Sequence, residues 1–530
     1  MIKVKFPFVF FLFSLPAIMN NLSYSQVLNL GYQKTIGGGN SDIPSRTLMT
    51  SDGGYIITGT SNSGISGEKT ESSRGGNDYW VIKFDNSHNI EWQKTLGGSL
   101  TDNSAAVAET PNGDFLVFGS SSSPVSGDKT AVDNGGGDYW LVKISINGAI
   151  LWDKSFGGTS SEVGNSIYVN NNGEIYLGGS SGSNIFGDKS ENSRGGNDYW
   201  ILKLDSLGNK IWDKTIGGAL NENFRDFIIL PNGEIVIYGT SPSNISGEKS
   251  QNSYNNSNDI WMVKLNSTGT LLWDLTLGGD DTESPGYSII FNNGFYYITC
   301  PSLSGISGVK TEASRGQFDI WIVKVNDNGI LIWDKTIGGS GSDSGLSLFI
   351  TSNNQLLVSG GSDSNISGDK TENSNGSNDA WIVALDISGV LLWQKTIGGS
   401  QSDVILCSHE IAPGYYLLTC YSSSNISGDK AENSRGLEDF WFVELQTDLS
   451  TGEIFLESEF QVFPNPAKNL IYINFEKIVN SELIKIFDFS GKLVYSEIPR
   501  KTMPIDISKY SSGFYFISYQ GNIKSFVVTE

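Results

Sequence analysis

Short runs of residues that favour β-strands recur along the chain, each bounded by Gly, Asn and Ser. In one stretch they cover residues 90–96, 104–109, 115–120 and 139–145. Runs of this length that are rich in β-branched and aromatic residues predict β-strands, and the Gly and Asn between them predict turns. No stretch has the 3.6-residue period of an amphipathic helix. We therefore expect an all-β fold.

Tryptophan spacing divides the strands into repeats. Seven tryptophans recur every 60 or 61 residues, and each of the other six lies 12 residues after one of them. The first set is Trp80, Trp140, Trp200, Trp261, Trp321, Trp381 and Trp441, and the second is Trp92, Trp152, Trp212, Trp273, Trp333 and Trp393. Tyr32 stands at the missing position of the second set. Seven units of four strands predict a seven-bladed β-propeller over residues 26–445.

The order of strands within a blade follows from turn chemistry and side-chain size. A tight turn such as residues 206–209 joins the two tryptophan-bearing runs, so these are the third and outermost strands. Runs such as residues 104–109 are rich in small residues, which suits the innermost strand. The repeats then begin with an outermost strand near residues 30–36 and end on a third strand at Leu445. We expect the first strand to complete the last blade and close the ring.

The N-terminus has the pattern of a secretory signal peptide over residues 1–25. Two lysines precede an apolar run over residues 6–19, and the small residues Ser23 and Ser25 follow it. The run is shorter than the roughly 20 residues that cross a bilayer. We expect the mature chain to have no transmembrane segment.

Composition narrows the choice of function. The chain has 35 Lys and Arg against 57 Asp and Glu, a net charge of −22, which disfavours nucleic-acid binding. Three cysteines, Cys300, Cys407 and Cys420, are too few for a disulfide framework. If Pro413 and Gly414 form a two-residue turn, Cys407 and Cys420 face each other across a hairpin, and a bridge and two free core thiols both remain open.

Two acidic positions recur in every unit. The connection into each innermost strand repeats Gly-Gly-x-x-x-acid, which places a carboxylate near the mouth of the channel at Asp42, Asp102, Glu162, Glu222, Glu283, Asp343 and Asp403. The long loop after the second strand repeats an Ile/Val-x-Gly-acid-Lys phrase and ends in Asp78, Asp138, Asp198, Asp259, Asp319, Asp379 and Asp439.

These repeated acids have two interpretations. In the structural one, the carboxylates accept backbone N–H bonds and the lysines offset their charge. In the other, the long loops bind calcium, the only cofactor that the sequence indicates, through hard oxygen ligands. The calcium candidates are Asp188, Glu191, Asp198, Asp369, Glu372 and Asp379.

Catalysis finds less support than binding. The two histidines, His88 and His409, stand in no context that suggests a triad or a metal site. A carbohydrate-active hydrolase or lyase that uses acids at the channel mouth is the alternative. We take as ligand-face candidates the residues near the innermost strands that break the repeat, together with one crossover acid beside them: Arg46, Glu222, Phe224, Arg225 and Asp226.

The repeats resemble a known class. Residues 319–325, followed by Gly329 and Trp333, resemble the β-propeller repeats of secreted Bacteroidota proteins. The hairpin over residues 384–393 is also similar to the signature of quinoprotein-type propellers, which supports the strand order. We expect a secreted or cell-surface propeller that binds a glycan or protein ligand through its loop-rich face.

The 60-residue period ends near Phe460, after a linker over residues 446–459. Residues 460–467, then 484–492, then 505–508 with 512–516 resemble, in order, the blocks of the type A C-terminal sorting domain of the type IX secretion system. The resemblance implies a small β-sandwich over residues 460–530 that engages the secretion machinery, directs passage across the outer membrane and is then cleaved. Alternating apolar residues in this tail independently predict a small all-β domain.

Overall fold

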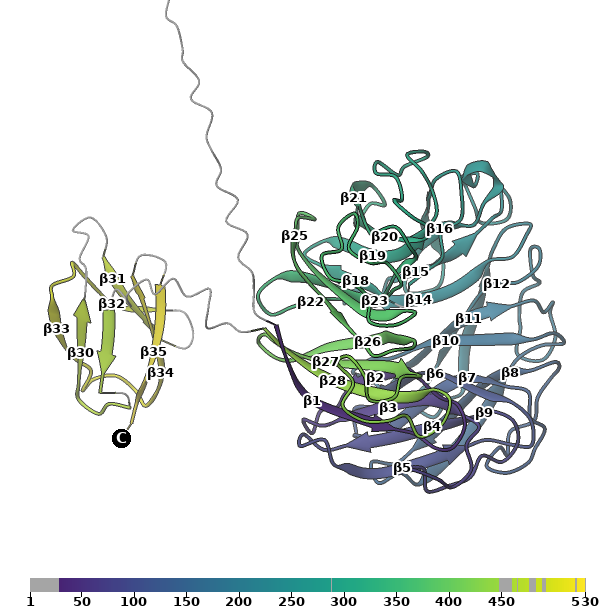
Figure 1. The fold of residues 1–530 in the computed structure, drawn as a ribbon, viewed down its shortest axis with the longest axis horizontal. Helices are drawn as coiled ribbons and strands as arrows, with labels where there is room; N and C mark the ends of the chain where they lie inside the picture. Colours follow the sequence, from purple (N-terminus) through teal and green to yellow (C-terminus); the bar gives the residue numbers. More distant parts are fainter. Residues whose placement is uncertain are drawn as a thin grey trace, which may run out of the picture. The chain divides into compact units, whose positions relative to one another are not determined.

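The computed structural model describes residues 28–286, 288–447, 460–464, 466–475, 483–488, 492–519 and 522–529. The predicted signal peptide, residues 1–25, and most of the predicted linker, residues 446–459, lie outside the described residues. The chain divides into two compact units, Met1–Thr447 and Asp448–Glu530. In both units almost all of the regular secondary structure is β-strand (Figure 1).

The described part of the first unit forms seven four-stranded antiparallel sheets. In six of them, four consecutive strands pair in chain order. The remaining sheet contains β26, β27 and β28, and β1 from the other end of the unit pairs with β28 (Figure 1). This order within each sheet is the one that turn chemistry predicts.

The first strand of each sheet contacts the equivalent strand of the next sheet, and β26 contacts β2. We call these the innermost strands. They are β2 (Asp42–Met49), β6 (Asp102–Glu109), β10 (Glu162–Val169), β14 (Asn223–Ile229), β18 (Ile289–Asn292), β22 (Asp343–Ile350) and β26 (Asp403–Ala412). β18 is short because Pro285 and Gly286 precede it: proline has no N–H for a strand ladder, and glycine weakens a strand.

The other strands follow the innermost strands outward. The second strands are β3 (Tyr55–Ser61), β7 (Phe115–Ser121), β11 (Ile175–Ser181), β15 (Ile235–Ser241), β19 (Phe295–Ser302), β23 (Gln355–Ser362) and β27 (Tyr415–Ser422). The third strands are β4 (Asp78–Phe84), β8 (Asp138–Ile144), β12 (Asp198–Leu204), β16 (Asp259–Leu265), β20 (Asp319–Asn326), β24 (Asp379–Asp386) and β28 (Asp439–Thr447). The outermost strands are β1 (Leu28–Ile36), β5 (Ile90–Leu96), β9 (Ile150–Phe156), β13 (Lys210–Ile216), β17 (Leu271–Leu277), β21 (Leu331–Ile337) and β25 (Leu391–Ile397). A short 3-10 helix, η1 (Tyr254–Asn256), lies where the 61-residue spacing places the extra residue.

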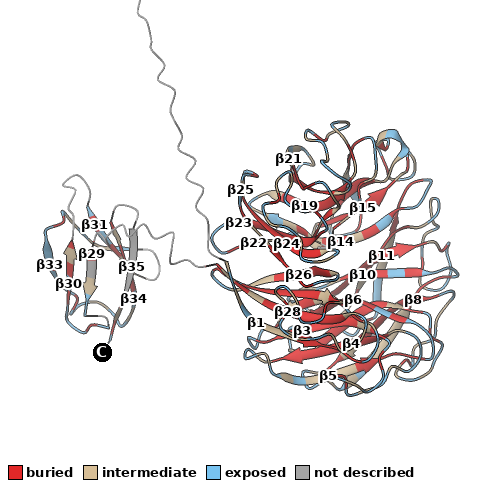
Figure 2. Cartoon of the chain, viewed as in Figure 1, coloured by how far each residue is buried: buried red, intermediate tan, exposed pale blue. Residues whose placement is uncertain are grey.

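Both sets of tryptophans pack against the neighbouring sheet, and the second and third strands of each sheet are largely buried (Figure 2). The ring of Tyr79 lies 4.9 Å from that of Trp140 on the next sheet, and its hydroxyl donates to the Trp140 carbonyl at 3.3 Å. In the second set, Trp92 Nε1 donates to the carbonyl of Ile146, in a turn of the next sheet, at 2.8 Å. Large aromatic side chains thus fill each of these interfaces and set the spacing of the sheets.

Similar contacts join the last sheet to the first. The ring of Phe440, on β28, lies 5.1 Å from that of Trp80. Arg435 forms an ion pair with Glu68 at 3.0 Å, between the long loops of the two sheets. The last sheet is therefore attached to the first by an aromatic contact and an ion pair of the kinds found between other neighbouring sheets.

The second unit has two sheets around one apolar core. One contains β29 (Phe460–Phe463), β30 (Leu470–Phe475) and β33 (Thr502–Asp506); the other contains β31 (Ile484–Asp488), β32 (Leu493–Glu497), β34 (Gly513–Tyr519) and β35 (Asn522–Val528). Ile471 and Ile473 of the first sheet and Ile486 of the second belong to the same buried cluster. The alternation predicted for this tail is present: Leu470 is exposed and Ile471 is buried.

The three cysteines are free and buried. Cys420 lies opposite Ile405, and Cys407 lies opposite Thr419. A β-bulge between residues 405 and 407 shifts the register, so the two cysteines do not face each other as a regular hairpin requires. The disulfide between Cys407 and Cys420, which the sequence left open, is not formed. All three cysteines are core residues, including Cys300.

Candidate functional site

The seven acids of the Gly-Gly-x-x-x-acid pattern are buried at the entry to the innermost strands. The carboxylate of Asp102 accepts the N–H of Gly98 at 2.7 Å and the hydroxyl of Ser123 at 2.9 Å. Equivalent bonds occur at Asp42, Glu162, Glu222, Glu283, Asp343 and Asp403. Through these hydrogen bonds the acids hold the crossover against the long loop. This favours the structural interpretation over one in which the acids contact a ligand in the channel.

Each crossover acid also lies beside the aspartate that begins the third strand of the preceding sheet. A Cβ built on Gly157 would lie 2.1 Å from Asp138 Oδ1 and 2.7 Å from Glu162 Oε2, so only glycine leaves room for the two carboxyl groups. Burial, with Glu162 adding to the effect, raises the pKa of Asp138 to about 7. The seven pairs are Asp439–Asp42, Asp78–Asp102, Asp138–Glu162, Asp198–Glu222, Asp259–Glu283, Asp319–Asp343 and Asp379–Asp403.

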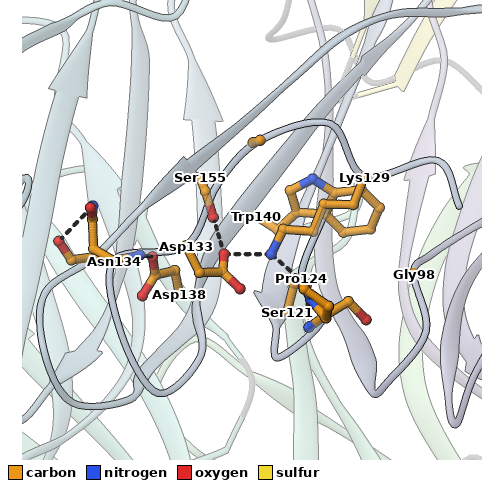
Figure 3. A network of polar contacts seen from close by, with 12 residues as sticks. Gly98, Ser121, Pro124, Lys129, Asp133, Asn134, Asp138, Trp140 and Ser155 are labelled. Carbon is orange, nitrogen blue, oxygen red and sulfur yellow. Dashed lines mark hydrogen bonds and ion pairs between the residues drawn. The ribbon is translucent and has the colours of Figure 1, made fainter. Parts of the chain in front are cut away.

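The lysine of the Ile/Val-x-Gly-acid-Lys phrase is buried in every unit. Figure 3 shows Lys129 pointing toward Asp133 and Ser121, and its Nζ lies 5.9 Å from the centre of the Trp140 ring. Burial lowers the pKa of the equivalent Lys189 to about 8, while the acids around it oppose the shift. The equivalent lysines are Lys69, Lys129, Lys189, Lys249, Lys310, Lys370 and Lys430. Each ammonium group bonds at least one Ser or Thr hydroxyl, and Lys129 also bonds the carboxylate of Asp133. These bonds hold each loop in place.

We expect the variant Asp259→Asn to resist alkaline pH better than the wild type. Burial, with Glu283 adding to the effect, raises the pKa of Asp259 from 3.8 to about 8. The folded chain therefore keeps a proton that the unfolded chain releases above about pH 4. The resulting stability is fully present below pH 4 and is lost as the pH rises through 8, by up to about 1.4 kcal/mol per pH unit. The N–H of Tyr254, which bonds Asp259 at 2.6 Å, can still donate to the amide oxygen that the substitution introduces.

The measurement is thermal melting at pH 5 and pH 8. The wild type should melt several degrees higher at pH 5, and Asp259→Asn should reduce that difference. Asp205→Asn, in an exposed turn, is the control and should not reduce it. Equal destabilisation of Asp259→Asn at both pH values would contradict the role of the buried pair.

The six calcium candidates bond to other parts of the protein. Glu191 accepts a bond from Lys214 at 2.7 Å, and Asp188 accepts the N–H of Gly157 at 3.2 Å. Asp198 is buried in one of the acid pairs. The equivalent Glu372, Asp369 and Asp379 make the same kinds of contact. Across the part of the chain that the structure describes, no three His, Cys, Asp or Glu residues gather as a metal site requires. Calcium binding stays a prediction.

The structure brings together three of the five ligand-face candidates. Arg46 on β2 lies 3.7 Å from Asp226 on β14, and Arg46 and Arg225 line one cavity of about 240 Å³. Phe224 is only 3% exposed and packs in the apolar core. Glu222 is one of the buried crossover acids. Arg46, Arg225 and Asp226 therefore form a cluster between two sheets far apart in sequence.

Sequence reasoning missed a set of exposed side chains on the long loops, which we call the aliphatic ring. The Ile or Val that opens each Ile/Val-x-Gly-acid-Lys phrase is 56–72% exposed. Its loop is held in place: Asn192 Oδ1 accepts the N–H of Ile185 at 3.0 Å, and Ser66 Oγ accepts the N–H of Gly39 in the crossover at 2.7 Å. The ring consists of Ile65, Val125, Ile185, Ile245, Ile306, Ile366 and Ile426. The available signal was one apolar residue, repeated seven times, inside a polar loop.

Residues 461–529 belong to the family of secretion system C-terminal sorting domains, whose model they match. This confirms the resemblance to the sorting domain of the type IX secretion system. The domain implies export, interaction with the secretion machinery and a surface or secreted location. Among the described residues, no helix is long and apolar enough to cross a membrane.

More distant similarities cover larger parts of the chain. Regulatory protein FlaEY of Caulobacter vibrioides is 22% identical over 70% of this chain, and the match spans 41% of that protein's length. A protein of unknown function from Dyadobacter fermentans aligns with 79% of this chain and 99% of its own, at 10% identity and a TM-score of 0.41. The Neurospora crassa Pan2 WD40 domain aligns with 77% of this chain and 90% of its own, at 9% identity and a TM-score of 0.40.

Proposed function

We propose that the first unit is a seven-bladed β-propeller, closed by β1, that binds an extracellular glycan or protein ligand through its loop-rich face. That face consists of the long loops and the crossovers into the innermost strands. Contacts from each innermost strand to the next, and from β26 back to β2, support the closed ring. After export the sorting domain is cleaved, and the propeller remains at the cell surface or is released.

The aliphatic ring is the observation that carries the binding function. Seven Ile or Val side chains, 56–72% exposed, occupy equivalent places on one face. Isolated exposed apolar residues are ordinary on protein surfaces, but seven of them at equivalent places on one face offer a ligand the same apolar contact seven times. Seven equivalent weak contacts add up on a ligand that reaches several of them.

The loops are also preorganised for binding. Arg194 of one long loop forms an ion pair with Glu248 of the next at 2.7 Å, and Arg435 and Glu68 repeat this contact between the last loop and the first. The buried lysine of each long loop and the pairs of buried acids also hold each loop in place. A loop that is already ordered loses little conformational entropy on binding, which favours affinity.

We expect replacement of three neighbouring ring residues to weaken binding on a glycan and protein array by about tenfold or more. The variant is Ile185→Ser with Ile245→Ser and Ile306→Ser, in the full chain. Each change removes an exposed aliphatic contact and leaves the bonds of the loop backbone in place.

The matched control places the same change on the outermost strands, at Ile211, Leu272 and Ile332, which are 47–52% exposed. This control should bind as the wild type does, and melting temperatures should show that both triple variants are folded. Equal binding by the two triple variants would contradict the role of the ring. Turnover of a polysaccharide on the array would favour the hydrolase or lyase instead.

A further inference from the structure

The innermost strands share an irregularity that turns one side chain out of the sheet. In six of the seven sheets the register between the innermost and second strands shifts by one residue. Such a β-bulge leaves one residue unpaired and redirects its side chain. The six bulged residues, which the register between the two strands skips, are Ser45, Ala105, Asn165, Arg225, Leu346 and Leu406.

Five of these six residues line the cavity of about 240 Å³ that also holds Arg46. They come from five sheets, so the cavity lies where the innermost strands converge. Ile43 and Pro44, directly after the crossover acid of β2, line it too, which places it at the loop-rich end of those strands. The bulges therefore build the wall of a central cavity.

The cavity differs from the rest of the unit because its residues do not repeat. The buried lysine is the same in all seven units, and the crossover position is always an acid. By contrast, the six bulge positions carry Ser, Ala, Asn, Arg, Leu and Leu. A small ligand with different groups on its different sides needs different partners around it, and the bulged residues provide them.

The cavity carries positive charge in an acidic protein. Arg46 and Arg225 line it, and Asp226, which lies 3.7 Å from Arg46, balances only one of the two positive charges. Asp226 also accepts the hydroxyl of Ser166 at 2.5 Å, and Arg225 Nε donates to the carbonyl of Gly286 at 3.0 Å. These bonds fix the charged groups, and a guanidinium has five N–H donors, so it can bond a ligand and the protein at once.

We propose that this cavity binds a hydroxylated carboxylate of the size of one uronic acid residue. The guanidinium groups match the planar, bidentate geometry of a carboxylate. Ser45 Oγ donates to the Ser104 carbonyl at 2.8 Å, so its oxygen accepts from a ligand hydroxyl, and the amide of Asn165 both donates and accepts. The volume lies below the roughly 300–1,000 Å³ of pockets for drug-sized ligands, which fits a single small molecule.

The site is separate from the aliphatic ring, so it can be tested even if the ring binds nothing. The probes are sodium glucuronate, glucose as its neutral analogue, and sodium sulfate, titrated into the full chain by calorimetry. Glucuronate should bind, glucose should bind at least tenfold more weakly, and sulfate should not compete at equal concentration.

The variants are Arg225→Gln and Asn165→Asp. Loss of the charged hydrogen bond, or a new negative charge in the cavity, should weaken glucuronate binding by about tenfold or more. Arg500→Gln, an exposed arginine of the second unit, is the control and should leave the affinity unchanged. Asn165→Asp keeps the test decisive if Arg225→Gln does not fold.

Three results would overturn the proposal. The first is equal affinity for glucuronate and glucose, and the second is sulfate binding without glucuronate binding. The third is an affinity for glucuronate that Asn165→Asp leaves unchanged. Loss of array binding by the aliphatic-ring variant bears on the proposed function alone.

Discussion

A chain that ends at residue 455 should fold its propeller and remain in the periplasm. The signal peptide that the sequence predicts directs a chain across the inner membrane only, and the sorting domain over residues 461–529 implies the second crossing. The first unit completes its last sheet with its own β1, so it takes no strand from the tail. Loss of surface protein should be nearly complete, because the truncation removes the sorting domain and leaves the first unit able to fold.

Cell fractionation of the native host measures this result, with mass spectrometry of the wild-type C-terminus as a test of cleavage. Two substitutions on β30 provide a matched comparison. Ile471→Asp places a charge in the core of the second unit, where Ile471 is 0% exposed, and should also block export. Leu470→Asp changes a side chain that is 36% exposed and should not. Surface display of the truncated chain at the wild-type level would contradict the role of the tail.

Much of the strand order could be read from the sequence because each repeat shows the same signals seven times. The tryptophan sets mark the third and outermost strands, and Gly or Asn marks the turns. The run expected at residues 104–109 is a strand over Asp102–Glu109. The two added residues begin at the acid of the crossover, whose bond to Gly98 closes the connection.

Register irregularities could not be predicted from the sequence. No one residue type marks a bulge: the bulged residues in the first four sheets are Ser45, Ala105, Asn165 and Arg225. Whether a bulge forms depends on how the seven innermost strands pack against one another, which is a property of the assembled unit. The expected Cys407–Cys420 alignment and the position of the central cavity both depend on these bulges.

The role of the crossover acids was visible in the spacing but open to two interpretations. Gly-Gly-x-x-x-acid places the acid four residues after the glycine N–H that it accepts, as Asp102 does from Gly98. The first glycine is required because a Cβ on Gly97 would lie 1.9 Å from Asp78 Oδ1. Only the structure shows that Asp102 lies beside Asp78 of the preceding sheet. Asp78 is 24 residues earlier in the chain, and a local sequence pattern does not predict contacts over that separation.

Removal of β1 should cost the first unit most of its stability. The strand buries Ile36, which is 2% exposed, and Thr35 Oγ1 accepts a bond from the buried Lys430 at 2.9 Å. Loss of a buried aliphatic side chain costs about 2–5 kcal/mol, and an ammonium group left without a partner costs about 1–3 kcal/mol more. Their sum is comparable to the total of about 5–15 kcal/mol that stabilises a typical domain. Thermal melting of a chain lacking residues 28–36 should show no cooperative transition near that of the wild type.

A point variant separates ring closure from a general effect of truncation. Lys430 bonds Thr35 at 2.9 Å across the closing pair of strands, and Lys69 bonds Thr95 at 2.7 Å within the first sheet. If β1 closes the ring, Thr35→Val and Thr95→Val should lower the melting temperature by similar amounts. If Thr95→Val lowers the melting temperature and Thr35→Val leaves it unchanged, the last sheet is stable without β1.

The aliphatic ring and the central cavity both depend on closure of the first unit by β1. A disulfide between β1 and β28 tests this closure most directly. Asn29 and Gln446 are paired residues of these antiparallel strands, at a separation that a disulfide can bridge. The control is Lys34→Cys with Gln446→Cys. Lys34 pairs with Phe442, so this cysteine pair is four residues out of register, about 13 Å along the strand. After mild oxidation, mass spectrometry should find the cross-linked peptides in Asn29→Cys with Gln446→Cys and not in the control. No cross-link in that variant, or equal cross-linking in both, would contradict the closed ring.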